Sequence, residues 1–209
     1  LPIPDHVPDE AAAFTEPLAT VVKALRRAGL REGDRVAVIG LGVMGLLHGM
    51  VALRWGAERV WGIERLPARR EIAVRFGILP LSPEEAAERI REESEGWGAD
   101  VVVVGPGSVE AIELGWSLAA PGGTLLLFTP TPPEARWPVD VHTLYFREIR
   151  VIPSYSAGPP EMREALALLS EGLPVESLIT HRLSLEEAPQ GYQAMRSYEA
   201  LKVLVYPFR

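Results

Sequence analysis

The sequence contains no cysteine, and this absence excludes disulfide bonds and thiolate-held metal sites within its 209 residues. It also lacks an apolar run near the roughly 20 residues of a membrane helix, and it has no basic-then-apolar signal segment at its start. No lysine or arginine run exceeds two residues, and the net charge is −7. A basic surface for a phosphate backbone is therefore not expected. We predict a cytoplasmic protein with no nucleic-acid and no membrane partner.

What the sequence does contain is typical of a globular α/β protein. Hydrophobic residues make up 47% and charged residues 23%, which allows one sizeable core and excludes a disordered or fibrous chain. Strand-like apolar runs alternate with segments that have apolar residues at helical spacing. The strand-like runs are 36–39, 59–64, 101–104, 124–128 and 148–152. This alternation predicts a doubly wound parallel sheet with helices on both faces.

Helix signals lie before, between and after these runs. Thr15 is predicted to cap a helix that ends at Gly29. Ser82, followed by Pro83 and three positions later by Glu85, has the pattern of a capping box with proline at the first helical position. Further helices are predicted over 108–119 and 160–172.

The most specific motif is the glycine-rich turn after the first predicted strand, Gly40-Leu41-Gly42-Val43-Met44-Gly45. In a G-x-G-x-x-G turn at this place, the first glycine permits the tight turn and the second lets the backbone approach a pyrophosphate. The third lets the helix pack on the strand, and the backbone N–H groups that open the helix attract phosphate charge. The motif predicts a Rossmann fold with strand order 3-2-1-4-5-6 and a dinucleotide at the carboxyl ends of the strands. The alternative is a glycine turn without a ligand.

Glu64 ends the second predicted strand 22 residues after Gly42, near the spacing at which a carboxylate accepts hydrogen bonds from the adenosine ribose. This favours NAD. Arg65 and Arg69 follow directly and favour a ribose phosphate, and hence NADP, if they face the nucleotide. Two alternatives without a ligand stay open: in one, Glu64 is a solvated carboxylate at a strand end, and in the other, the two arginines lie on an exposed helix face.

The segment 33–45, Gly-Asp-Arg-Val-Ala-Val-Ile-Gly-Leu-Gly-Val-Met-Gly, resembles the nucleotide-binding block of the medium-chain, zinc-type alcohol and polyol dehydrogenases. The resemblance continues at 98–102, 121–123, 147–149 and 200–203, so it covers essentially the whole chain. It corresponds to the cofactor half and the C-terminal end of that family. We expect the chain, which begins at Leu1, to be part of a longer protein.

The resemblance implies a division of the chain. Residues 15–172 would form the dinucleotide-binding domain, and the flanks 1–14 and 173–209 would pack with a GroES-like catalytic domain that this chain lacks. That domain holds the family's zinc ligands and its Gly-His-Glu motif, which does not occur here. The implied activity is hydride transfer between an alcohol or sugar hydroxyl carbon and nicotinamide, with zinc in the full-length protein but not bound by this chain alone. The family also implies a homodimer or homotetramer.

Several further site residues rest on the resemblance. Gly105, Pro106, Thr129 and Lys202 are candidates for cofactor binding. The family usually has Ala-Thr-Gly where this chain has Gly-Pro-Gly at 105–107, and often has a glycine beside the nicotinamide where Thr129 and a proline follow a phenylalanine. Glu16 corresponds to a glutamate that polyol-dehydrogenase relatives supply to the catalytic zinc. A glutamate favoured by the helix dipole is the equal alternative.

The remaining alternatives concern function. One is a zinc-free, NADPH-dependent quinone or enoyl reductase of the same superfamily, and the other is a nucleotide-sensing module without catalysis. The four histidines lack the short spacing of a metal site, and His48 is expected to be a packing residue. We expect the chain alone to bind a cofactor without turnover, because it lacks the groups for proton removal.

Overall fold

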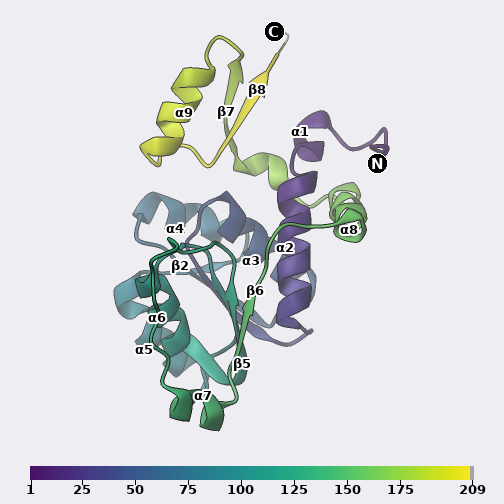
Figure 1. The fold of residues 1–209 in the computed structure, drawn as a ribbon. Helices are drawn as coiled ribbons and strands as arrows, with labels where there is room; N and C mark the ends of the chain where they lie inside the picture. Colours follow the sequence, from purple (N-terminus) through teal and green to yellow (C-terminus); the bar gives the residue numbers. More distant parts are fainter. Residues whose placement is uncertain (208–209) are drawn as a thin grey trace.

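In the computed structural model, which describes residues 1–207, the main sheet has six parallel strands in the order β3-β2-β1-β4-β5-β6 (Figure 1). The doubly wound fold and the strand order predicted from the sequence are confirmed. The strands are β1 (Arg35–Ile39), β2 (Arg59–Ile63), β3 (Leu79–Leu81), β4 (Ala99–Val104), β5 (Ala119–Leu127) and β6 (Arg150–Pro153).

The central strands are buried because their sequences are apolar at successive positions. Val101 to Val104 of β4 pair in parallel with β1 on one side and β5 on the other, and all four are at most 1% exposed. A strand covered on both faces needs apolar side chains at odd and even positions alike. The run of four valines meets this requirement.

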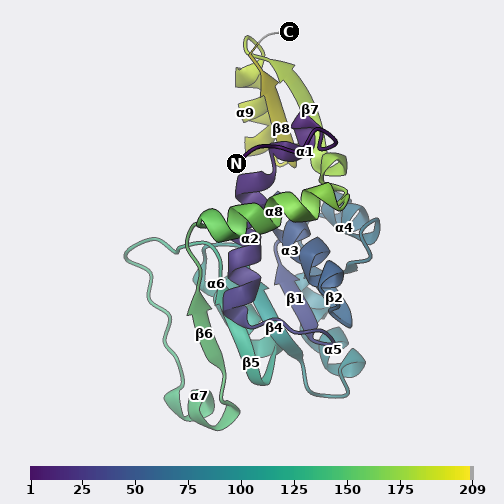
Figure 2. The same cartoon turned by 90° about the vertical axis from the view of Figure 1, so that its right-hand side faces the viewer.

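Helices cover both faces of the sheet. One core lies between the sheet and α2 (Thr15–Ala28), α3 (Val43–Arg54) and α8 (Pro159–Ser170). The other lies between the sheet and α5 (Pro83–Glu93) and α6 (Val109–Leu118). In Figure 2, α8 lies across α2. These layers leave the carboxyl ends of β1, β2 and β4 accessible for a ligand.

Helix termini follow the predicted chemistry at two of three places. The capping box is confirmed, because Glu85 Oε1 accepts a hydrogen bond from the Ser82 backbone N–H at 2.6 Å. Gly29 ends α2 with a φ of 74°. The prediction of Thr15 as a cap is wrong: α1 (Asp9–Ala12) leads almost directly into α2, so Thr15 is already helical and its hydroxyl donates to the Ala12 carbonyl.

The elements that the sequence did not predict include one strand and one helix of the main domain. The strand is β3, which has only three residues and includes Pro80. A proline is tolerated there because β3 lies at the edge of the sheet. The helix is α7 (Val141–Arg147), which has no buried residue and hence no apolar stripe. Since Glu148 ends α7 in the left-handed region at φ 52°, β6 begins at Arg150, two residues later than predicted.

The two ends of the chain meet in a second lobe, at the top of Figure 1. It contains the 3₁₀ turn η1 (Val175–Leu178), β7 (Ile179–Ser184), α9 (Ala188–Arg196) and β8 (Lys202–Tyr206), with β7 and β8 paired in parallel. Arg182 binds the Glu10 carboxylate through two nitrogens, at 2.8 and 2.6 Å. The predicted flanks 1–14 and 173–207 therefore lie together, while residues 208–209 of the second flank lie outside the described residues. Over residues 1–207, no helix combines the length and the apolarity needed to cross a membrane.

Candidate functional site

A cavity of about 870 Å³ lies at the carboxyl ends of β1, β2 and β4. Doubly wound sheets bind ligands at this place, because the direction of the strand order reverses between β1 and β4. The predicted site residues that line it, eleven in all, are Gly40, Gly42, Val43, Met44, Gly45, Glu64, Arg65, Arg69, Gly105, Pro106 and Thr129. The structure thus brings most of the predicted site together around one space.

The three glycines of the turn have distinct geometric roles. Gly40 has a φ of 87°, which side chains rarely allow, and its N–H donates to the Ile63 carbonyl at 2.8 Å. A Cβ at Gly45 would lie 1.8 Å from the Gly40 carbonyl oxygen, so the turn closes only with glycine there. A Cβ at Gly42 would have only Arg69 Nη1 within 4 Å, at 3.9 Å. The space over Gly42 is therefore open toward the cavity.

The first turn of α3 carries no side-chain cap. Gly42 is its N-cap residue, in an extended conformation, and the helix begins at Val43. The first N–H groups of a helix have no partner within it and attract anions. An uncapped helix start beside open space suits a phosphate group.

Glu64 is buried at 8% exposure and connects two backbone segments. Its Oε2 accepts from the Leu41 N–H at 2.9 Å, inside the glycine turn, and its Oε1 accepts from the Leu66 N–H at 3.0 Å. Each carboxylate oxygen retains a lone pair after one such bond. Glu64 can therefore hold the turn and still accept from two hydroxyls of a ligand.

The arginines after Glu64 are arranged differently from one another. Arg69 lies against the turn: its Nη1 is 3.9 Å from Glu64 Oε2, and its Nε is buried without a hydrogen-bond partner. Arg70 Nη1 donates to the carbonyls of Glu64 and Arg65, at 2.7 and 3.0 Å. The side chain of Arg65 is exposed at the rim. Arg69 is thus the partly buried arginine that lies against the glycine turn, and Arg65 is the exposed one.

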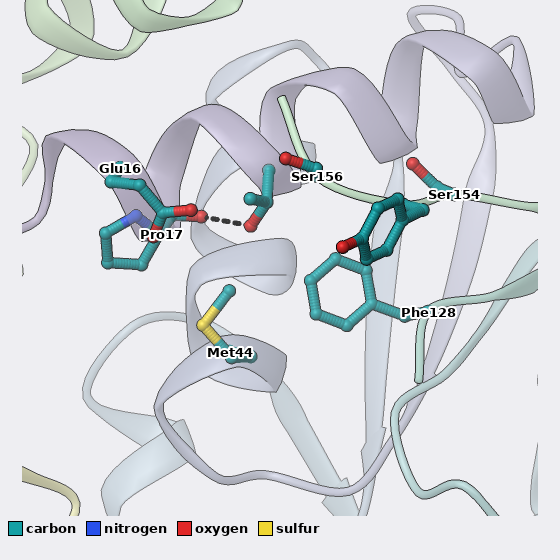
Figure 3. A pocket seen from close by; sticks show the side chains of 8 residues that line it. Glu16, Pro17, Met44, Phe128, Ser154 and Ser156 are labelled. Atoms are coloured by element: carbon teal, nitrogen blue, oxygen red, sulfur yellow. Dashed lines mark hydrogen bonds between the residues drawn. The ribbon is translucent and has the colours of Figure 1, made fainter. Parts of the chain in front are cut away.

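A second, smaller cavity of about 190 Å³ continues the site toward α2 (Figure 3). Glu16, Ser154 and Ser156 contribute polar groups, and Met44 and Phe128 line both cavities. Figure 3 shows Glu16 on α2 across the space from Phe128 and Ser154, with Met44 between the two sides. Ser154 and Ser156 were not predicted from the sequence. Nothing in their local pattern marks them, because they approach the site from the loop after the edge strand.

The buried polar atoms without a partner point to a polar ligand. Within residues 1–207, such side-chain atoms are His48 Nε2, Arg69 Nε and Ser154 Oγ. All three residues line one of the two cavities. Because a buried polar atom normally has a partner, their concentration around this site suggests that a bound molecule supplies the missing hydrogen bonds.

His48 is 1% exposed and lies on α3 behind Phe128, edge-on to its ring at a centroid distance of 4.5 Å. Its Nδ1 lies 2.8 Å from the Met44 carbonyl, which only an N–H can satisfy. Burial lowers the pKa of His48 to about 4, and the bond to Met44 only partly opposes this shift. The imidazole is therefore neutral at pH 7, in agreement with the packing role expected from the sequence.

Glu16 and Lys202 lie outside the large cavity. Lys202 Nζ is 5.1 Å from the centre of the Phe14 ring. Burial lowers the pKa of Lys202, while the nearby charge of Glu16 raises it. The described residues contain no group of three histidine, aspartate or glutamate side chains that could hold a metal ion. Glu16 by itself does not make a zinc site, and the residues present do not fit zinc without ligands from elsewhere.

Comparisons with known proteins give the family of the chain. The sequence profile of the zinc-binding dehydrogenase family matches residues 39–171. A sorbitol dehydrogenase of Halalkalibacterium halodurans is 33% identical over 214 residues, which cover 98% of this chain and 61% of that protein.

Two solved structures share the fold at similar identity. An alcohol dehydrogenase from Thermus sp. ATN1 has a TM-score of 0.91 at 31% identity, over 97% of this chain and 60% of its own. A zinc-binding dehydrogenase from Sinorhizobium meliloti 1021, bound to NADP, has a TM-score of 0.91 at 30% identity, over 98% of this chain and 61% of its own. The chain thus spans about three fifths of the length of each of these relatives.

Proposed function

Because this chain belongs to the zinc-binding dehydrogenase family of medium-chain alcohol and polyol dehydrogenases, we propose that it forms the NAD(P)-binding part of such an enzyme. The observation that carries the proposal is the glycine turn: an open space over Gly42, next to an uncapped helix start and the Glu64 carboxylate. A pyrophosphate fits the first two features, and ribose hydroxyls fit the third.

In this proposal, different residues of the site bind successive parts of the dinucleotide. Glu64 and Arg69 hold the adenosine ribose, and Gly42, Val43 and Met44 receive the pyrophosphate through their backbone. The nicotinamide end then lies between Met44 and Phe128, the two residues that border both cavities. Gly105, Pro106 and Thr129 border the same groove from the ends of β4 and β5. Lys202 is proposed to turn from Phe14 toward the phosphates when the cofactor binds.

The cofactor, when bound, supplies the hydride acceptor or donor, and an alcohol or sugar hydroxyl carbon is the other partner. Glu16, Ser154 and Ser156 face the small cavity, where the reacting carbon would approach. Zinc requires ligands from a catalytic domain, to which Glu16 would add one carboxylate. The flanks 1–14 and 173–207 are the surface proposed to pack with that domain. A cytoplasmic location and the lack of nucleic-acid and membrane partners stay predictions from composition.

Titration of the 209-residue chain with NADH, followed by energy transfer from tryptophan to the nicotinamide, tests the proposal. We expect saturable binding, displaced by ADP-ribose, and no turnover of sorbitol or simple alcohols by this chain. Absence of NADH and NADPH binding by the folded chain would contradict the proposal. The names of the relatives favour an alcohol or polyol dehydrogenase over a zinc-free reductase or a nucleotide sensor. Zinc content of the full-length gene product separates the dehydrogenase from the zinc-free reductase.

A further inference from the structure

We propose that Tyr198 is a positioning residue for Arg69, and that its ring holds the Arg69 guanidinium over the glycine turn to bind the adenosine half of the dinucleotide. The inference rests on the proposed function and adds to it a residue from the C-terminal lobe. That lobe otherwise packs with the N-terminal residues, and Figure 1 shows it beside α4 (Pro67–Val74), the helix that carries Arg69.

The first observation is contact across the two lobes. The guanidinium carbon of Arg69 lies 5.4 Å from the centre of the Tyr198 ring, within the range of a cation–π interaction. Both side chains line the large cavity, together with Glu64. Tyr198 is thus the C-terminal residue that borders the nucleotide groove.

The second observation concerns the other side of the guanidinium. Nη1 of Arg69 faces Glu64 Oε2 at 3.9 Å, too far for a hydrogen bond, and Nε is buried without a partner. The Arg69 side chain is only 17% exposed. The described residues thus leave Arg69 Nε unsatisfied beside a cavity that a ligand can occupy.

The third observation is the backbone of Tyr198. It follows α9 at a φ of 62°, a conformation that residues other than glycine rarely adopt. Its N–H donates to the Met195 carbonyl, and the next residues close the same cap, a position that favours glycine. At the ends of α2 and α8 the chain does use glycine, with Gly29 and Gly172 at φ 74° and 81°. Of the described left-handed residues other than glycine, which are Glu95, Glu148, Ser156 and Tyr198, Tyr198 is the aromatic one and the one that lines the large cavity.

These observations combine into one arrangement. The ring restricts Arg69 from one side and the turn restricts it from the other, so the donors of Arg69 point along the groove toward the ribose and its phosphate. Since the guanidinium would otherwise lose side-chain freedom on binding, fixing it beforehand strengthens binding. Cation–π energies of this kind correspond to a threefold to tenfold change in Kd, as an order-of-magnitude estimate of about 0.7 to 1.4 kcal/mol.

The test uses three variants of the 209-residue chain. Tyr198→Gly removes the ring and suits the left-handed backbone, so the thermal midpoint should stay equal or rise. Tyr198→Phe keeps the ring and loses the hydroxyl. Tyr192→Ala removes a nearby tyrosine, on α9, that is 70% exposed and does not line the cavity. For each, the Kd of NADH and of ADP-ribose is measured by calorimetry.

We expect Tyr198→Gly to raise both Kd values about threefold to tenfold, and Tyr198→Phe and Tyr192→Ala to leave them within twofold of the wild type. In an Arg69→Met background, Tyr198→Gly should have no further effect, because the ring acts through Arg69. Unchanged affinity in Tyr198→Gly, or an equal loss in the Arg69→Met background, would overturn this role while leaving the proposed function intact. A wild-type chain that binds neither ligand would overturn the proposed function and this role with it.

Discussion

The Glu64 carboxylate accepts a hydrogen bond from the backbone N–H of Leu41 at 2.9 Å, which ties the end of β2 to the middle of the glycine turn. The same carboxylate accepts from Leu66 and has a second lone pair on each oxygen. One buried residue therefore shapes the turn and faces the ribose. Its effect on structure and its effect on cofactor choice follow from the same bonds.

We predict that NAD(H) binds more tightly than NADP(H), by about tenfold or more, since the charge of Glu64 repels a ribose 2′-phosphate. Fluorescence titration with NADH and NADPH measures the ratio. Glu64→Gln should reduce the ratio of the Kd of NADPH to the Kd of NADH. It should also lower the free energy of unfolding by about 1 to 3 kcal/mol, because an amide cannot accept from both backbone N–H groups. Equal or tighter binding of NADPH by the wild type would mean that Arg65 or Arg69 outweighs the carboxylate.

The contrast between Gly42 and Gly45 gives a second prediction. Gly42→Val should abolish NADH binding and leave the far-ultraviolet circular dichroism nearly unchanged, because its φ of −69° suits any residue and its Cβ would point into open space. Gly45→Ala is the matched variant: its Cβ meets the Gly40 carbonyl at 1.8 Å, and we expect a loss of about 1 to 3 kcal/mol in unfolding free energy. Retained NADH affinity in folded Gly42→Val would refute the proposed pyrophosphate position.

The third prediction concerns pH. Burial lowers the pKa of His48 from 6.5 to about 4, so between these values the unfolded chain binds a proton that the folded chain does not. Above pH 6.5, His48 therefore takes nothing from the free energy of unfolding. As the pH drops from 6.5 toward 4, the proton taken up by the unfolded chain lowers this free energy. The total loss is about 3 kcal/mol.

Urea unfolding of the wild type and of His48→Leu at pH 7 and pH 4.5 measures this difference. The variant should lose less stability on acidification, since the acidic and basic groups other than His48 are common to both proteins. His6→Gln, at an exposed histidine, should behave as the wild type does. Parallel losses in wild type and His48→Leu would show that His48 is not the buried base that resists protonation.

Local chemistry made most of the fold predictable from the sequence. The four valines of β4 are consecutive and the Ser82–Glu85 capping box spans four residues, so both patterns can be read directly from the sequence. The strand β3 and the helix α7 were not predictable in this way. A three-residue edge strand gains its stability from the neighbouring β2, and α7 has no buried face to leave a periodic pattern.

The site follows the same division. The glycine turn and Glu64 lie within 25 residues of one another and form a recognisable spacing. Ser154 and Tyr198 reach the cavities from segments that are distant in the sequence, and no local rule marks them. For Lys202, the position expected from the sequence and the position in the structure differ. The resemblance places it at the cofactor, and in the structure its ammonium group lies over Phe14.

β6 is one of the two edge strands of the main sheet, and no described strand pairs with its outer side. β6 pairs only with β5, and Ser154 N donates to the Leu127 carbonyl on that side, so the alternating N–H of Val151 points outward. Charged side chains such as those of Arg147 and Arg150 can guard an exposed strand edge. Instead, Arg147 donates to the Ala119 carbonyl and Arg150 to the Ala28 carbonyl at 3.3 Å. Both guanidinium groups therefore bind backbone carbonyls of their own chain.

We predict that β6 pairs with β6 of a second copy in a two-fold dimer, because an exposed strand edge needs cover and a self-complementary edge provides it. α7, directly before β6, exposes Tyr145 at 75% and Phe146 at 70%, and these rings would extend the interface. Light scattering at tens of micromolar should give twice the 22.9 kDa of one chain. Val151→Pro removes the outward donor and should give a folded monomer, whereas Val151→Ala keeps the donor and should stay dimeric. A monomeric wild type, or a folded Val151→Pro variant that dimerises unchanged, would show that this edge is not the interface.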